Sequence, residues 1–182
     1  MIRAISIPTE AGEFFAHFSE RGLVGLDFPG RMRVENPSCP QLSTQIPLNT
    51  LAASPEFRRW EQLTASALRA ALAGKPAGML PLFDWRGATE FQQSVWRALL
   101  RIPPGRTSTY AEVAAAAGHP RAVRAAGSAC GANPIPVLVP CHRVVASGGK
   151  LGGFSGGLDW KRRLLAREGV ALESSELLIR GK

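Results

Sequence analysis

The chain has 182 residues, of which 45% are hydrophobic and 20% are charged, as in a globular protein that buries its own core. The net charge of +8 is unevenly placed, since residues 1–84 carry 8 Lys/Arg and 8 Asp/Glu while residues 85–182 carry 14 and 6. The second half is therefore predicted to bind a polyanion, with nucleic acid favoured over a merely solubilising basic surface. Because no long apolar run or signal peptide is present, neither a membrane span nor export is expected.

The three cysteines, Cys39, Cys130 and Cys141, show no C-x-x-C spacing. Neither a disulfide framework nor a zinc finger is expected, and the thiols are interpreted as reduced side chains in a cytosolic or nuclear compartment, of which the cytoplasm is the expected location. We expect no bound metal, no cofactor and a monomeric chain.

The first half is predicted to form a small sheet. Alternating residues indicate strands at 13–18 and 22–28, joined by a hairpin turn at 19–22. The prolines and hydroxyl residues of 36–47 are typical of a loop, and 82–85 is predicted to be a last strand.

A helix is predicted to follow that loop. Ser54 is suited to cap it, Pro55 to its first turn, and Glu56 to its positive end. Apolar residues at helical spacing continue to Leu72, and Gly74 is expected to stop the helix.

The second half is predicted to be mainly helical. Thr89 begins a capping-box pattern for a helix that ends at the proline-rich 102–105 segment. Thr109 or Ser108 is expected to cap the next helix, at 110–117.

Pro120 is predicted to open a further helix that runs to about Cys130, so that two short helices form a helix-turn-helix candidate. The bulkiest apolar residue of this second helix is Val123, and a helix of small residues can bring its backbone close to another surface. Either it packs closely on a neighbouring helix, or it enters a DNA groove with Arg121 and Arg124 on one face, and both readings stay open.

A glycine-rich segment, 147–157, fits no phosphate-binding loop motif. It is expected to be either a flexible hairpin or the wall of a pocket where backbone must approach a planar ligand. Asp159 is predicted to cap a final helix that Gly169 ends, with Glu168 at the C-terminal end, where the helix dipole disfavours a carboxylate.

Cys141 is the strongest candidate for chemistry. The apolar run 136–139 is predicted to be extended, and Pro140 interrupts it. We expect the sulfur to lie at a bend rather than in a core, with His142 and Arg143 favouring the thiolate, the nucleophilic form.

These elements predict an α+β fold with two domains and a tail. Residues 1–84 would form a supporting domain with a small β-sheet and a helix. Residues 85–170 would form a helical domain with a winged-helix-like helix-turn-helix and an active-site strand or loop. Residues 171–182 would form a C-terminal tail.

Residues 133–145, Asn-Pro-Ile-Pro-Val-Leu-Val-Pro-Cys-His-Arg-Val-Val, closely resemble the active-site signature of the O6-alkylguanine-DNA alkyltransferases. The likeness extends from about Phe91, through 106–110 and 122–127, to 161–168. It covers nearly all of the second half, and the asparagine-proline lead-in with the proline-cysteine-histidine-arginine core is a specific pattern.

The resemblance implies a single-turnover DNA repair protein that flips O6-alkylguanine out of duplex DNA and takes the alkyl group irreversibly. It implies that Cys141 is the acceptor and that His142 removes the thiol proton through a water. Glu168 would orient His142, and Tyr110 would help the guanine to depart.

The resemblance also implies a protein that meets double-stranded DNA in the minor groove, with Arg124 filling the space of the flipped nucleotide. The expected DNA contacts are Arg121, Arg124, Ala125, Ala126 and Gly127, and the expected substrate-pocket residues are Asn133, Val144, Phe154 and Ser155.

Three other functions are weighed. A helix-turn-helix regulator would bind undamaged DNA with an incidental cysteine, although only two arginines are available to read base edges. A damage sensor of the alkyltransferase-like kind replaces the acceptor cysteine, which is present here as Cys141. A cysteine hydrolase ranks last, because no oxyanion-loop signature is found.

Overall fold

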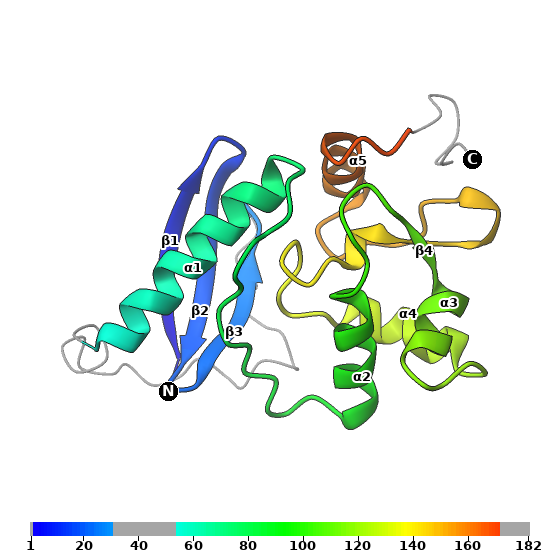
Figure 1. Ribbon diagram of the computed structural model, residues 1–182, viewed down its shortest axis with the longest axis horizontal. Coiled ribbons are helices and arrows are strands. Elements are labelled where there is room, and N and C mark those ends of the chain that lie inside the picture. Colours follow the sequence, from blue (N-terminus) through cyan, green and yellow to red (C-terminus); the bar gives the residue numbers. More distant parts are fainter. Residues whose placement is uncertain (1, 31–53, 172–182) are drawn as a thin grey trace.

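The computed structural model describes residues 2–30 and 54–171 (Figure 1). Cys39, the loop predicted at 36–47 and nearly all of the predicted tail lie outside the described residues.

The first half contains a three-stranded antiparallel sheet in the order β1-β2-β3, formed by Arg3–Thr9, Gly12–Ser19 and Gly22–Asp27. The predicted hairpin is confirmed, because β2 and β3 are joined by a tight turn after Ser19. The sequence did not predict β1. Its residues are exposed or half-exposed except for buried Ile7, so its hydrophobic alternation is weak.

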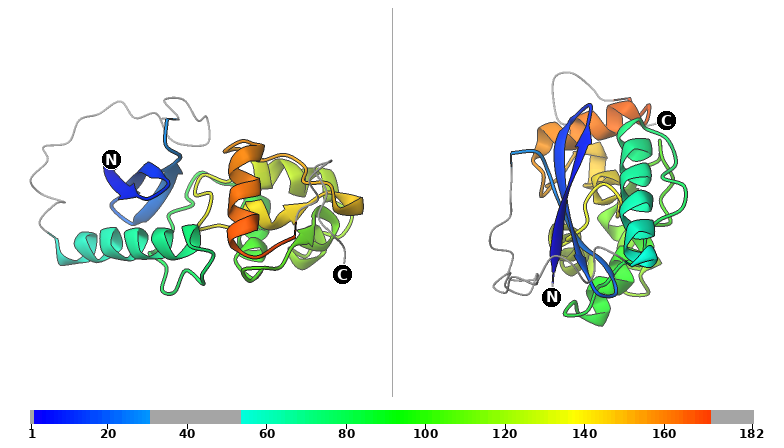
Figure 2. Two further views of the ribbon diagram at one scale, coloured as in Figure 1. Left: turned by 90° about the horizontal axis from the view of Figure 1, so that it is seen from above. Right: turned by 90° about the vertical axis from the view of Figure 1, so that its left-hand side faces the viewer.

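The predicted helix is confirmed as α1, Pro55–Leu72. The Ser54 hydroxyl accepts a hydrogen bond from the Phe57 backbone N–H at 3.1 Å, which satisfies one free donor of the first turn. The helix lies along one face of the sheet (Figures 1 and 2), where Phe57 packs edge-on against Phe18 with ring centroids 5.3 Å apart.

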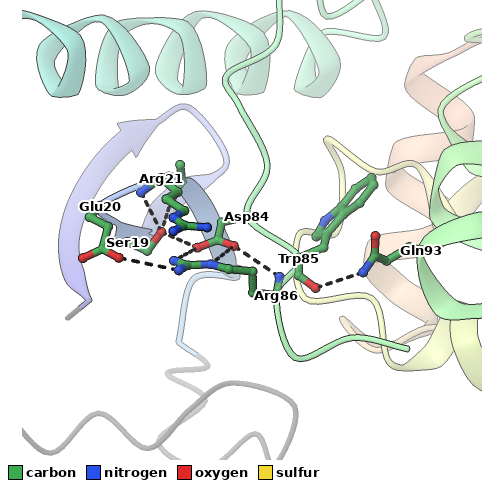
Figure 3. A network of polar contacts seen from close by, with 8 residues as sticks. Ser19, Glu20, Arg21, Asp84, Trp85, Arg86 and Gln93 are labelled. Carbon is green, nitrogen blue, oxygen red and sulfur yellow. Dashed lines mark hydrogen bonds and ion pairs between the residues drawn. The ribbon is translucent and has the colours of Figure 1, made fainter. Parts of the chain in front are cut away.

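The strand predicted at 82–85 is wrong, since only a single bridge joins Phe83 to Leu23. A polar network holds this connection instead (Figure 3). Arg86 donates to both carboxylate oxygens of Asp84, at 2.8 and 2.6 Å, and the Ser19 hydroxyl donates to Asp84 at 2.5 Å. The connection between the two halves is thereby tied to the β2–β3 turn.

The second half is built from short helices around a two-stranded parallel sheet, β4-β5. Its elements in chain order are α2 (Glu90–Leu99), β4 (Ser108–Thr109), α3 (Tyr110–Ala116), α4 (Val123–Gly131), η1 (Cys141–Arg143), β5 (Val144–Val145), η2 (Ser147–Gly149) and α5 (Leu158–Arg167). The capping box predicted at Thr89 is present, Thr109 is the cap of α3 and forms a second capping box, and α3 with α4 forms the expected helix pair.

Two helix starts differ from the prediction. The chain forms turns from Pro120 onward and α4 begins at Val123, so Arg121 precedes the helix and shares no helical face with Arg124. Asp159 lies in the first turn of α5 instead of capping it, because Gly157 occupies the cap position with a φ of 92° that disfavours other residues.

An aromatic cluster joins the two halves. Phe14 of β2 and Phe28 after β3 pack on Trp160 of α5 with centroids 5.5 and 4.9 Å apart, and Phe28 also meets Phe154 at 5.7 Å. Because the buried residues form one hydrophobic cluster across both halves, the sheet and the glycine-rich segment support each other.

The Asp84 network predicts a pH-dependent contribution to stability. The Arg86 guanidinium holds the pKa of Asp84 at about 2, below its usual 3.8. Because the folded-state pKa is depressed, this contribution is present above pH 4 and is lost as the pH falls towards 2. Asp84→Asn should reduce the free energy of unfolding by about 1 kcal/mol at pH 7, after allowing for solvent screening of half-exposed Arg86, and by much less at pH 2.5.

Urea titrations at the two pH values measure this difference. Asp159→Asn is the matched control, since Asp159 forms only an exposed ion pair with Arg162. An Asp84→Asn effect that is equal at both pH values would contradict the assignment.

Candidate functional site

The chain reaches Cys141 through a tight turn. The run 136–139, predicted to be extended, is bent instead, and the Val139 N–H donates to Ile135 O at 2.9 Å. Val137 has a φ of 75°, a region that costs a β-branched residue of the order of 1–3 kcal/mol. After Pro140 the chain enters the short helix η1, which confirms the predicted bend.

The sulfur of Cys141 is buried, with only 4% of the residue exposed, which corrects the expectation that it would stay out of the core. The side-chain amide of Asn133 donates to it, with Nδ2 3.1 Å from Sγ. Backbone contacts fix that amide, because Oδ1 accepts from the Ile135 N–H at 3.0 Å and Nδ2 also donates to Val139 O at 2.8 Å. Asn133 therefore presents an N–H to the sulfur, which suits a sulfur that carries negative charge.

His142 and Glu168 form a buried pair. The imidazole Nε2 lies 2.9 Å from Glu168 Oε1, and each side chain is 1% exposed. Burial lowers the pKa of His142, against an opposing effect of Glu168, so the neutral imidazole is favoured. Since Nε2 donates to the carboxylate, Nδ1 is left as a proton acceptor, and Nδ1 has no hydrogen-bond partner among the described residues.

Arg143 binds Glu168, a contact that the sequence did not predict. Its Nε lies 3.1 Å from both carboxylate oxygens of Glu168, its Nη2 lies 2.9 Å from Oε1, and its Nη1 donates to Ile102 O. Burial alone would raise the pKa of Glu168, but the hydrogen bonds from His142 and Arg143 outweigh it and hold that pKa at about 2.

A cavity of about 280 Å³ opens beside the sulfur, lined by Tyr110, Gly127, Cys130, Gly131, Cys141, Gly153, Phe154 and Ser155. A cavity of about 150 Å³ holds a benzene ring, so this one has room for a two-ring base. Burial raises the pKa of Tyr110, which keeps its hydroxyl protonated and able to donate. The glycine-rich segment is thus a pocket wall, and a side chain at Gly152 would come within 2.9 Å of the Tyr110 hydroxyl.

Lys161 ties the active-site strand to this wall. The buried ammonium donates to Val144 O at 2.6 Å, to Gly153 O at 3.2 Å and to Leu151 O. Burial lowers its pKa to about 8, so Lys161 remains largely protonated at pH 7. Its place on the apolar face of α5, three and four residues before Leu164 and Leu165, was the sequence signal for a buried lysine.

Small residues form the buried face of helix α4. Ala126 and Ala129 are buried, and Trp96 Nε1 of α2 donates to Ala129 O at 2.8 Å. The expected DNA contact Ala126 therefore does not face solvent, whereas Arg124 and Ala125 do. Arg121 is exposed in the turn before the helix.

The structure brings the predicted pocket residues together with one exception. Phe154 and Ser155 line the cavity, as does Gly127, which was expected to contact DNA, and Asn133 binds the sulfur. Val144 is buried away from the cavity, and its carbonyl is the Lys161 acceptor. Sequence reasoning missed Cys130, a second buried thiol in the cavity wall, whose pKa burial raises to about 12.

Among residues 2–30 and 54–171, no group of three or more His, Cys, Asp or Glu side chains is arranged to hold a metal ion. In the same part of the chain, no helix combines the length and hydropathy that a membrane span requires.

Several known proteins are similar to this chain in sequence and in fold. A family model described as the DNA-binding domain of 6-O-methylguanine DNA methyltransferase matches residues 90–170. The methylated-DNA–protein-cysteine methyltransferase of Methanosarcina barkeri is 41% identical over 166 residues, covering 89% of this chain and 94% of that relative.

Solved structures agree. The O6-methylguanine methyltransferase of Mycobacterium tuberculosis matches with a TM-score of 0.67 and 34% identity, covering 92% of this chain and 93% of that one. The structure of the same organism's OGT in complex with DNA has a TM-score of 0.64 at 34% identity, covering 92% and 91%. The chain belongs to the methylated-DNA–protein-cysteine methyltransferase family, which confirms the resemblance.

The Lys161 contacts predict a large cost for removing the ammonium. Lys161→Met would keep most of the side-chain volume but leave three buried carbonyl acceptors without their donor, so we expect a loss of about 2–4 kcal/mol in the free energy of unfolding. Arg162→Met, on the exposed side of α5, should cost less than about 0.5 kcal/mol. Urea unfolding of both variants measures the difference, and similar costs would mean that the three carbonyl contacts contribute little.

Proposed function

We propose that this protein repairs DNA by direct damage reversal, moving the alkyl group of O6-alkylguanine onto Cys141 Sγ once per molecule. The new bond joins Sγ to the alkyl carbon, and the bond from that carbon to guanine O6 breaks. The observation that carries the proposal is the position of the sulfur. It lies in the wall of a ring-sized cavity and next in sequence to a His142–Glu168 pair.

The buried pair supplies a route for the thiol proton. His142 Nδ1 accepts it through a water, because Nε2 is engaged by Glu168. The Glu168 carboxylate stabilises the imidazolium that forms, and the Asn133 amide stabilises the thiolate. Each charge that appears during proton transfer thereby has a partner in place.

Tyr110 assists the leaving base. Its hydroxyl stays protonated because of burial, and it lies in the wall of the same cavity as the sulfur. As guanine departs it accumulates negative charge, and a hydrogen bond or proton from Tyr110 offsets that charge. Phe154 and Ser155 complete the wall against which the base lies.

Helix α4 delivers the base to this cavity. Gly127, on the cavity side of α4, leaves room for close approach to the DNA backbone, and exposed Arg124 enters the base stack in place of the flipped nucleotide. Extrusion costs a few kcal/mol, and this insertion offsets part of that cost. Arg121 and Ala125 contact the flanking DNA.

The organisation of the chain follows from the same proposal. We assign DNA binding and alkyl transfer to residues 85–170 and a supporting role to residues 1–84, with residues 171–182 as a tail. The protein acts as a monomer in the cytoplasm.

The proposal predicts a covalent product. Incubation with duplex DNA that contains O6-methylguanine should raise the intact mass by one methyl group, at one equivalent per protein. Cys141→Ala should abolish the gain, because it removes the acceptor sulfur. Cys130→Ala should keep it, because a thiol with a pKa of about 12 is not a nucleophile at pH 7.

Mass spectrometry of the intact protein and of its peptides measures the adduct. No gain by the wild type would reject transfer and favour a sensor or regulator, for which DNA binding that survives Cys141→Ala is the remaining signature. A gain of many equivalents of product per protein would favour a turnover enzyme.

A further inference from the structure

The C-terminal end of α1 lies beside the C-terminal end of α5, which the left view of Figure 2 shows from the side. Arg167 Nη1 donates to Leu72 O at 2.9 Å across this contact. A Cβ atom on Gly74 would lie 1.9 Å from Arg167 O and 3.1 Å from the Glu168 backbone N. Since real side chains never approach so closely, the contact exists only because residue 74 is glycine.

Glu168 is confined from another side as well. A Cβ atom on Gly105 would lie 2.9 Å from Glu168 O, and the Gly105 N–H donates to Glu168 Oε2 at 3.3 Å. The backbone next to the buried carboxylate is thus held between Gly74 of the first half and Gly105 of the α2–β4 connection.

The position of Glu168 affects the transfer of the Cys141 thiol proton to His142. His142 Nε2 lies 2.9 Å from Glu168 Oε1, and an increase of a few tenths of an ångström in this distance would weaken the hydrogen bond. Glu168 is the C-cap residue of α5, and its backbone N–H donates to Leu164 O at 3.1 Å, so the contacts with Gly74 and Gly105 add to those of its own last turn. A displacement of about 1 Å at such a group can cost on the order of a hundredfold in rate.

We propose that the end of α1 is a positioning element for alkyl transfer. Leu72 O holds the Arg167 guanidinium, and the close packing of Gly74 fixes the backbone of Arg167 and Glu168, and thereby the carboxylate that orients His142. The inference rests on the proposed function of Cys141, and it gives the first half of the chain a role in the chemistry beyond supporting the fold.

The test compares alanine at two glycines of one connection. Gly74 and Gly78 have φ angles of 72° and 68°, so the intrinsic strain of an alanine is the same, but nothing lies within 4 Å of a Cβ atom at Gly78. With saturating O6-methylguanine DNA in single-turnover reactions, Gly74→Ala should be at least about tenfold slower than the wild type. Gly78→Ala should stay within about twofold of the wild-type rate, although the strain of its positive φ should lower the melting temperature slightly.

The pH profile separates positioning from simple destabilisation. Three charged groups act on His142: Glu168 raises its pKa, whereas Arg143 and Lys161 lower it. If Glu168 is displaced, the half-maximal rate on the acid side should move to lower pH in Gly74→Ala and stay in place in Gly78→Ala. A loss of folded protein alone would lower the amplitude of the reaction without moving that midpoint.

Arg167→Met is the second variant, and it decides the outcome if Gly74→Ala does not fold. It removes the hydrogen bond to Leu72 O without adding an atom near Gly74, and we expect a rate about threefold to tenfold lower with the same direction of pH shift. If the wild type transfers methyl groups and the folded variants show the same rate and the same pH profile as the wild type, the positioning role is overturned. Absence of transfer in the wild type would instead reject the proposed function.

Discussion

The buried carboxylate of Glu168 is the interaction on which the rest of the site depends. It accepts hydrogen bonds from His142, Arg143 and the Gly105 N–H, donors that come from two separate segments, and its own position is set by a third, the end of α1. An isolated buried carboxylate would take up a proton, so these donors keep it charged. That charge in turn fixes the tautomer of His142, which determines the ring nitrogen that can receive a proton.

Arg143 and His142 both bind the Glu168 carboxylate, and this affects the protonation of His142. Arg143 binds Glu168 through two nitrogens and lowers its basicity, so less of the negative charge is available to hold a proton on His142. Burial acts in the same direction and lowers the pKa of His142. The imidazole therefore remains a neutral base in a site where a more strongly paired histidine would be protonated already.

Local chemistry made part of this structure predictable. The caps at Ser54, Thr89 and Thr109 depend on contacts within four residues, and the sequence located all three helices correctly. The burial of Cys141 depends on long-range packing, which a single sequence does not encode locally.

The contacts of Arg143 and the start of α4 were also not predictable from local sequence. Arg143 was placed beside the thiol because it is adjacent in sequence, yet its partners are 25 and 41 residues away, at Glu168 and Ile102. The start of α4 was placed too early because Pro120 is a good first-turn residue. The structure instead forms a turn that the Ala122 backbone N–H stabilises by donating to His119 O at 2.9 Å.

Glu168 holds His142 as a neutral imidazole with its proton on Nε2. Nitrogen-15 NMR of the unalkylated protein without DNA at pH 7 measures the protonation of both ring nitrogens directly. We expect a protonated Nε2, an unprotonated Nδ1, and loss of that preference in Glu168→Gln. A doubly protonated ring, or a proton on Nδ1, would contradict it.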